Sequence, residues 1–175
     1  MTRWRSLAPI ASGVSRIRPL ASMRFTDAVR WTGRDFGVMA ALLVGVYVMF
    51  ELLSRTSGIP QYRWGVAVAL LGLFLLTWIN LAVGIIGSED DPANLLYLLV
   101  PAVGAAGALL ARFRPRGMAR ATAGMAVVQA VIGVIALAAR LDTRPQVMIM
   151  NALFVGLFIG ASLLFGRAAE QEESA

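Results

Sequence analysis

Three consecutive carboxylates, Glu89, Asp90 and Asp91, interrupt a chain that is otherwise mostly apolar. Asn94 follows three residues later, and Asn80 lies in the apolar run that precedes them. Carboxylate, amide and backbone carbonyl oxygens are hard ligands of the kind that Ca²⁺ or Mg²⁺ prefers. These five residues therefore form a candidate site for a cation or a partner. Their spacing is not that of an EF-hand loop, so any metal site would be weak and its metal is open.

The same stretch is also typical of a capped turn between two helices, and this reading is favoured. Gly84 and Gly87 allow the chain to leave helical geometry. Asp91 is suited to the N-cap of the next helix and Pro92 to its first position. The carboxylates would then lie near the positive end of that helix dipole. A full acidic triplet beside Asn94 nevertheless exceeds what capping requires.

Composition removes many catalytic classes. All 16 basic residues are arginine, and the 175-residue chain contains no Lys, His or Cys. Missing cysteine excludes disulfides, Cys-ligated zinc, iron–sulfur clusters and thiol nucleophiles. Missing histidine removes the commonest transition-metal ligand and the usual general base near neutral pH. A membrane enzyme that used Mg²⁺ would usually carry two separated acidic clusters, and this chain has one. We therefore expect no enzymatic activity, and no cofactor beyond a weak Ca²⁺ or Mg²⁺.

Hydropathy indicates a membrane protein. Hydrophobic residues make up 58% of the chain and its mean hydropathy is +0.72, more than a soluble domain of this size can bury. Five continuous apolar segments are long enough to cross a bilayer, the third only just. They cover Phe36–Leu53, Trp64–Ile86, Leu95–Ala111, Met118–Ala139 and Val147–Phe165. Continuous runs without period-two alternation favour helices over barrel strands. The predicted fold is an all-α polytopic membrane bundle with five transmembrane helices.

The expected organisation has four parts. Residues 1–23 form a basic, disordered segment, and residues 24–35 an amphipathic interfacial helix. Residues 36–166 form the transmembrane bundle, and residues 167–175 a polar tail.

Arginines flank the apolar runs, which favours contact with anionic lipid headgroups over nucleic acid. The loop with Arg112, Arg114, Arg116 and Arg120 is a candidate site for headgroups or another anion. Seven further arginines precede the first apolar segment, and three intervening spans place the two groups on opposite sides. A re-entrant third segment, permitted by Pro101, would place them on the same side and leave four full spans. We favour five spans and leave the orientation open.

Polar and small residues within the apolar runs are candidates for helix packing. Asn80, Gln129 and Asn151 are expected to form interhelical hydrogen bonds. Glu51 is expected either to extend toward the interface or to pair with Arg55 four residues later. Gly156 and Gly160 form a GxxxG pattern in the last segment. This pattern serves either packing within the chain or a homodimer face.

The stretch "WINLAVGIIGSEDDPANLLY", followed by "ARFRPRGMARA", resembles a family of small bacterial membrane proteins with a GSED-x-PAN loop and no established activity. The resemblance extends from about Trp31 to Phe165 and is most specific over Asn80–Tyr97 and Arg112–Arg120. It implies an architecture and no mechanism. Asp91 stands where the family pattern has asparagine, which puts a strict ligand role at that position in doubt.

These observations favour a non-enzymatic protein of the bacterial inner membrane. We expect an accessory, scaffold or assembly subunit that acts through helix packing and the acidic loop. Its expected partners are the lipid bilayer and either a second copy or a larger membrane complex. The alternative is a small ion transporter or channel subunit that uses the acidic loop and Asn80 as a cation path.

Overall fold

The computed structural model describes residues 33–142 and 144–174, and all regular elements within these ranges are helical. The elements are the α-helices α2 (Gly33–Ser54), α3 (Pro60–Ala82), α4 (Leu99–Leu110), α5 (Pro115–Ala138) and α6 (Pro145–Glu173), and the 3-10 helix η1 (Pro92–Leu98). Five helical stretches are long and apolar enough to cross a membrane, with η1 and α4 forming the third. The predicted five-span helical fold is confirmed, and the chain is a multi-pass membrane protein.

Prolines set the beginnings of four elements. Pro60, Pro92, Pro115 and Pro145 each occupy the start of a helix, and the residue before each is extended. Proline has no N–H to donate and a fixed φ, so it fits the first helical turn, and it disfavours helical geometry in the residue before it. The second, third, fourth and fifth spans therefore begin two to four residues earlier than hydropathy alone predicts.

The second and fifth spans also end differently from the prediction. Helix α3 ends at Ala82 rather than at Ile86, because Gly84 adopts a φ of 69° that ends the helix. Ile85 and Ile86 are buried within the following loop instead. Helix α6 continues to Glu173, so the predicted polar tail is helical over its described part except for Ser174. The predicted segment over residues 1–23 lies outside the described residues, and so does the predicted interfacial helix over residues 24–35 except for its last three residues. Those three belong to α2, which is continuous from Gly33.

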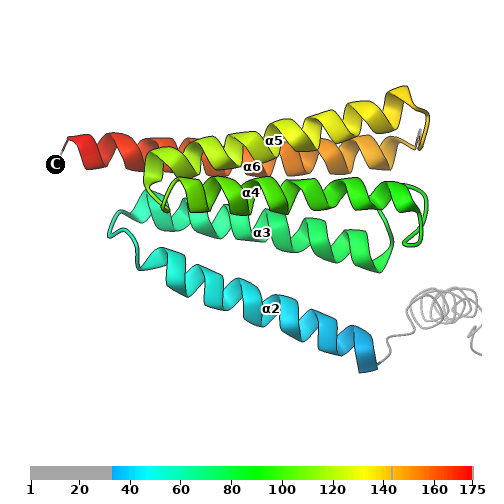
Figure 1. Cartoon of the computed structure of the whole chain (residues 1–175), viewed down its shortest axis with the longest axis horizontal. Helices are drawn as coiled ribbons and strands as arrows, with labels where there is room; N and C mark the ends of the chain where they lie inside the picture. Colours follow the sequence, from blue (N-terminus) through cyan, green and yellow to red (C-terminus); the bar gives the residue numbers. More distant parts are fainter. Residues whose placement is uncertain (1–32, 143, 175) are drawn as a thin grey trace, which may run out of the picture. The chain divides into compact units, whose positions relative to one another are not determined.

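The chain divides into two units at Ala40, and the arrangement described here is that of residues 41–174. Helix α6 packs against both α3 and α5, and α5 also packs against α4 (Figure 1). The short connections make consecutive helices antiparallel. Helix α2 differs from the other spans, because only 6% of its membrane-spanning window is buried, against 44% for α5. The core is therefore formed by α3 to α6.

Helix α6 contributes a seam to this core with the spacing of a coiled coil. The buried residues Val147, Asn151, Phe154, Phe158, Ala161, Phe165 and Ala168 alternate steps of three and four along it. Two glycines on α3 leave room for phenylalanine rings of α6. A Cβ added at Gly65 would lie 3.0 Å from the ring of Phe165, and one added at Gly72 would lie 3.0 Å from the ring of Phe158. Small residues thus let α3 and α6 approach closely where there is no hydrophobic drive between helices in lipid.

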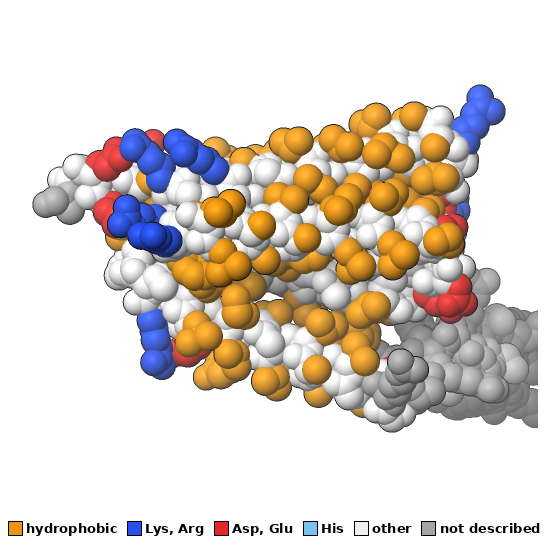
Figure 2. Space-filling view, in the orientation of Figure 1, with side chains coloured by type: hydrophobic (Ala, Val, Ile, Leu, Met, Phe, Trp, Pro, Cys, Tyr) orange, Lys and Arg blue, Asp and Glu red, His pale blue; other side chains and the backbone are white. Residues whose placement is uncertain are grey.

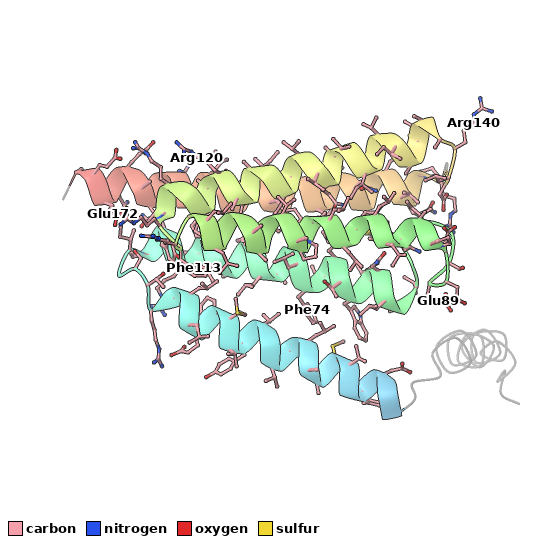
Figure 3. The ribbon with its side chains drawn as sticks, viewed as in Figure 1. Phe74, Glu89, Phe113, Arg120, Arg140 and Glu172 are labelled. Atoms are coloured by element: carbon pink, nitrogen blue, oxygen red, sulfur yellow. The ribbon has the colours of Figure 1, made fainter. Side chains whose placement is uncertain are left out.

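Charged side chains gather at the two ends of this bundle, with apolar side chains between them (Figure 2). We call the end with the α4–α5 loop the arginine end, and the end with residues 83–91 the acidic end. Arg120 and Glu172 lie at the first, and Glu89 and Arg140 at the second (Figure 3). The third span runs from the acidic end to the arginine end without turning back, with Pro101 in the first turn of α4. The re-entrant alternative is therefore wrong.

Candidate functional site

The loop between α3 and η1 is a capped junction, as the sequence predicts. Gly84 and Gly87 have φ values of 69° and 66°, which glycine adopts without steric cost. The side chain of Asp91 accepts a hydrogen bond from the backbone N–H of Ala93 at 2.9 Å, and Pro92 begins η1. The predicted N-cap and first helical position are confirmed.

The side chain of Asn94 fixes the conformation of this loop through hydrogen bonds to its backbone. Its Oδ1 accepts hydrogen bonds from the backbone N–H groups of Ile85 at 3.0 Å and Ile86 at 2.9 Å. Its Nδ2 donates to the carbonyl oxygens of Ile86 at 2.9 Å and Ser88 at 2.6 Å. The residue is 4% exposed. Both side-chain atoms are thus occupied by the backbone, and Asn94 belongs to the loop's framework rather than to a site open to a cation.

A clamp from the α5–α6 loop closes the acidic end. The Oδ2 of Asp142 accepts a hydrogen bond from the N–H of Gly87 at 3.1 Å, and Arg144 donates to the carbonyl oxygen of Gly87 at 3.1 Å. Arg144 also forms an ion pair with Asp142, whose side chain is only 7% exposed. Two loops more than fifty residues apart in sequence are therefore joined through one glycine.

Arg144 and the N–H of Gly87 hold the pKa of the Asp142 carboxyl well below its usual range, because both interactions favour the charged form. A carboxyl with a depressed folded-state pKa stabilises the fold above its unfolded pKa of about 4, and this contribution is lost as pH falls toward the folded value. We expect Asp142→Asn to lower stability at neutral pH and to flatten the loss of stability between about pH 5 and 2. The midpoint of unfolding in detergent, measured for parent and variant at several pH values between about 7 and 2, tests both expectations. Asp90→Asn, on the exposed part of the loop, is the control and should follow the parent profile.

Glu89 and Asp90 lie on the outer side of the junction. Both are exposed, and their side chains have no hydrogen bond or ion pair among the described residues. No group of three or more carboxylates converges as metal ligands would within the part of the chain that the structure describes. The triplet therefore divides into one capping residue, Asp91, and two solvent-facing charges. Cation binding at this loop stays a prediction that the observed geometry does not favour.

Polar residues inside the bundle form the predicted interhelical contacts. The Nε2 of Gln129 on α5 donates to the Oδ1 of Asn151 on α6 at 3.0 Å. The Nδ2 of Asn151 donates to the hydroxyl of Tyr97 at 3.1 Å and to the carbonyl oxygen of Val147 at 2.8 Å. The Val147 carbonyl fixes the orientation of the Asn151 amide, because an oxygen turned toward it would meet another acceptor. Three elements, η1, α5 and α6, are thereby joined at one point.

Asn80 lies at the end of α3 and donates from Nδ2 to the carbonyl oxygen of Asn94 at 3.2 Å. It therefore contacts the framework of the junction and not the exposed carboxylates. The pair of Glu51 and Arg55 forms as predicted, with an N–O distance of 2.6 Å. Of the two roles predicted for Glu51, the structure shows the ion pair.

The four arginines of the predicted headgroup site are exposed at the arginine end. Arg112 and Arg114 lie in the α4–α5 loop, and Arg116 and Arg120 lie in the first two turns of α5. Arg112 has a φ of 49° and occupies the left-handed position just after α4, and Arg116 pairs with Glu173 of α6 at 2.8 Å. Tyr62 of α3 donates to the carbonyl oxygen of Phe113 at 2.8 Å and fixes the loop to the bundle. Arg112, Arg114 and Arg120 have no ion pair within the described ranges. These three side chains remain open to headgroups.

Gly156 and Gly160 lie on the side of α6 away from its buried seam. A Cβ added at either glycine would meet nothing within 4 Å. By contrast, one added at Gly104 of α4 would lie 2.7 Å from the sulfur of Met125. A glycine thus serves packing inside the bundle on α4, whereas the two glycines on α6 face outward. With Ala152, the two glycines give three small residues at intervals of four on an open helix face.

Three residues of the site carried no recognised signal in the sequence. Asp142 and Arg144 precede Pro145, and the stretch "DTRP" before an apolar run is typical of a helix start. That pattern could have marked a capping acid, but not its contact with Gly87. Tyr97 could have been singled out as a polar ring in the third span, since buried tyrosines usually find a hydrogen-bond partner.

Comparisons of the chain with protein-family models, with curated proteins and with solved structures give no match. The resemblance over the stretch from Trp31 to Phe165 therefore stays a prediction.

Proposed function

We propose that this chain is a non-enzymatic integral membrane protein of the bacterial inner membrane that acts as an accessory, scaffold or assembly subunit. The observation that carries the proposal is the open face of Gly156 and Gly160 on α6. Lipid tails are as apolar as the helices, so association in a bilayer depends on close backbone approach at small residues. A flat strip that no part of the described bundle covers is suited to a helix from outside the chain.

The chemistry of the chain supports the same function. The sequence has no Cys, His or Lys, and the buried side chains of Asn94, Asp142 and Asn151 hold helices and loops together. The exposed Glu89 and Asp90 give the acidic end a local negative charge that suits a basic segment of a partner. The alternative is a cation path through Asn80. Its Nδ2 is bonded to the Asn94 carbonyl beneath a closed loop, and only its buried Oδ1, which has no hydrogen-bond partner among the described residues, would be available to a cation.

The proposal predicts that the parent protein associates through α6, with itself or with another membrane protein. Gly156→Ile would place a branched side chain on the open strip and should weaken that association at least tenfold, about 1.4 kcal/mol. Light scattering in detergent reports self-association, and affinity capture from native membranes reports other partners. Ala130→Ile is the matched control, because Ala130 is an exposed small residue on α5. A complex that both substitutions leave unchanged, or a parent that is monomeric and captures no protein, would contradict the proposal.

A further inference from the structure

At the arginine end, a groove of about 360 Å³ lies between the end of α2 and the start of α3. It is lined by Phe50, Gly58, Pro60, Arg63, Trp64 and Ala67. Its walls are apolar apart from Arg63, and its volume is within the range of small-ligand sites. An occupant must therefore present an apolar body to the walls and an anion to one guanidinium.

Arg63 is the charged residue of this groove, and no carboxylate of the described residues pairs with it. Its side chain is exposed and makes no ion pair within the described residues. The nearest arginine along the chain, Arg55, is different, because it is held by Glu51 at 2.6 Å. Glu173, a carboxylate of the same end, is taken by Arg116. Arg63 is thus available to an external anion.

The position of the groove sets the depth of that anion. Arg63 lies three residues into α3, about 5 Å along the helix from Pro60. Trp64 beside it is 66% exposed, as is usual for a tryptophan at the level of the headgroups. Ala67, one turn further along α3, extends the lining toward the hydrocarbon. The groove therefore begins at headgroup depth, with the charge at its mouth and the apolar walls below.

We infer that this groove is a binding site for one anionic phospholipid, with the phosphate at Arg63 and an acyl chain against Phe50, Trp64 and Ala67. A phospholipid is the membrane component that carries an anion and an apolar chain in the required order. A basic side chain near such a headgroup contributes about 1 kcal/mol, which corresponds to a preference of about fivefold over a zwitterionic lipid. This site is separate from the arginines of the α4–α5 loop and does not depend on the proposed function.

Quenching of tryptophan fluorescence tests the site directly, because Trp64 lines it. The full chain is reconstituted in vesicles that contain brominated phosphatidylglycerol or brominated phosphatidylcholine, and the Trp64 component is obtained by difference from Trp64→Phe. The parent should prefer phosphatidylglycerol at Trp64 by about fivefold. Arg63→Gln should reduce this preference to about one, and Ala67→Leu, which narrows the groove and keeps the charge, should also reduce it.

Arg120→Gln is the matched control, because it removes one exposed arginine from the same end but outside the groove. It should leave the preference at Trp64 unchanged. Equal quenching by the two lipids in the parent would overturn the inference. A preference that survives Arg63→Gln, or one that Arg120→Gln lowers equally, would also overturn it, because either result would assign the effect to the general surface charge.

Discussion

Asn94→Ala is expected to lower the free energy of unfolding by about 3 kcal/mol or more. The substitution leaves the buried N–H groups of Ile85 and Ile86 without an acceptor, and each such group costs about 1–3 kcal/mol. It also removes the donor to the carbonyl oxygens of Ile86 and Ser88. Reversible unfolding in mixed detergent micelles measures the difference.

Asp90→Asn is the comparison for this prediction, because the Asp90 side chain is exposed on the same loop and lacks a described partner. Its effect should stay within about 0.5 kcal/mol, as for other surface substitutions. If Asn94→Ala were as mild as Asp90→Asn, the loop would not depend on the Asn94 amide, and the assignment of Asn94 to the framework would be wrong.

Gly84→Ala is expected to destabilise the junction by about 2–4 kcal/mol. An alanine at a φ of 69° costs about 1–2 kcal/mol by itself. The new Cβ would in addition lie 2.3 Å from the carbonyl oxygen of Ser88, a backbone atom that can move only if the loop opens. The free energy of unfolding and the labelling rate of a single cysteine introduced at Ile86, in a chain that has no cysteine, would report global and local effects.

Gly166→Ala supplies the matched control for Gly84→Ala. Gly166 lies within α6 and a Cβ there would meet nothing within 4 Å. Alanine is favoured over glycine in a helix by about 1 kcal/mol, so this variant should be neutral or slightly more stable than the parent. Equal losses in the two variants would show that the cost comes from removing glycine in general and not from the geometry at Gly84.

Hydropathy and turn chemistry predicted the elements of the fold. The five spans, the Asp91 cap and the ion pair of Glu51 depend on residues that are close in sequence, so a single sequence carries them. The four prolines at helix starts carried more information than the hydropathy boundaries, because proline acts on backbone geometry directly.

Most contacts between elements could not be predicted from the sequence, and the reason is physical. In a membrane both the core and the solvent are apolar, so a helix does not show by its hydrophobicity which side faces the protein. Gly104 and Gly156 look alike in sequence, yet the first contacts Met125 and the second faces outward. The clamp of Asp142 on Gly87 was likewise hidden, since it depends on which loops the bundle brings to one end.

The weak packing of α2 has a consequence for how the protein is made. Leu53 is the only residue of its described part that is buried, so the energy of the protein core does little to hold this helix. It is synthesised before α3 to α6, so its place across the membrane is decided by partition into lipid before these four helices are available for packing. For this helix, insertion and not folding is the stabilising step, in line with the two stages of membrane-protein assembly. The apolar surface of α2 is therefore still available for contacts when α3 to α6 pack together.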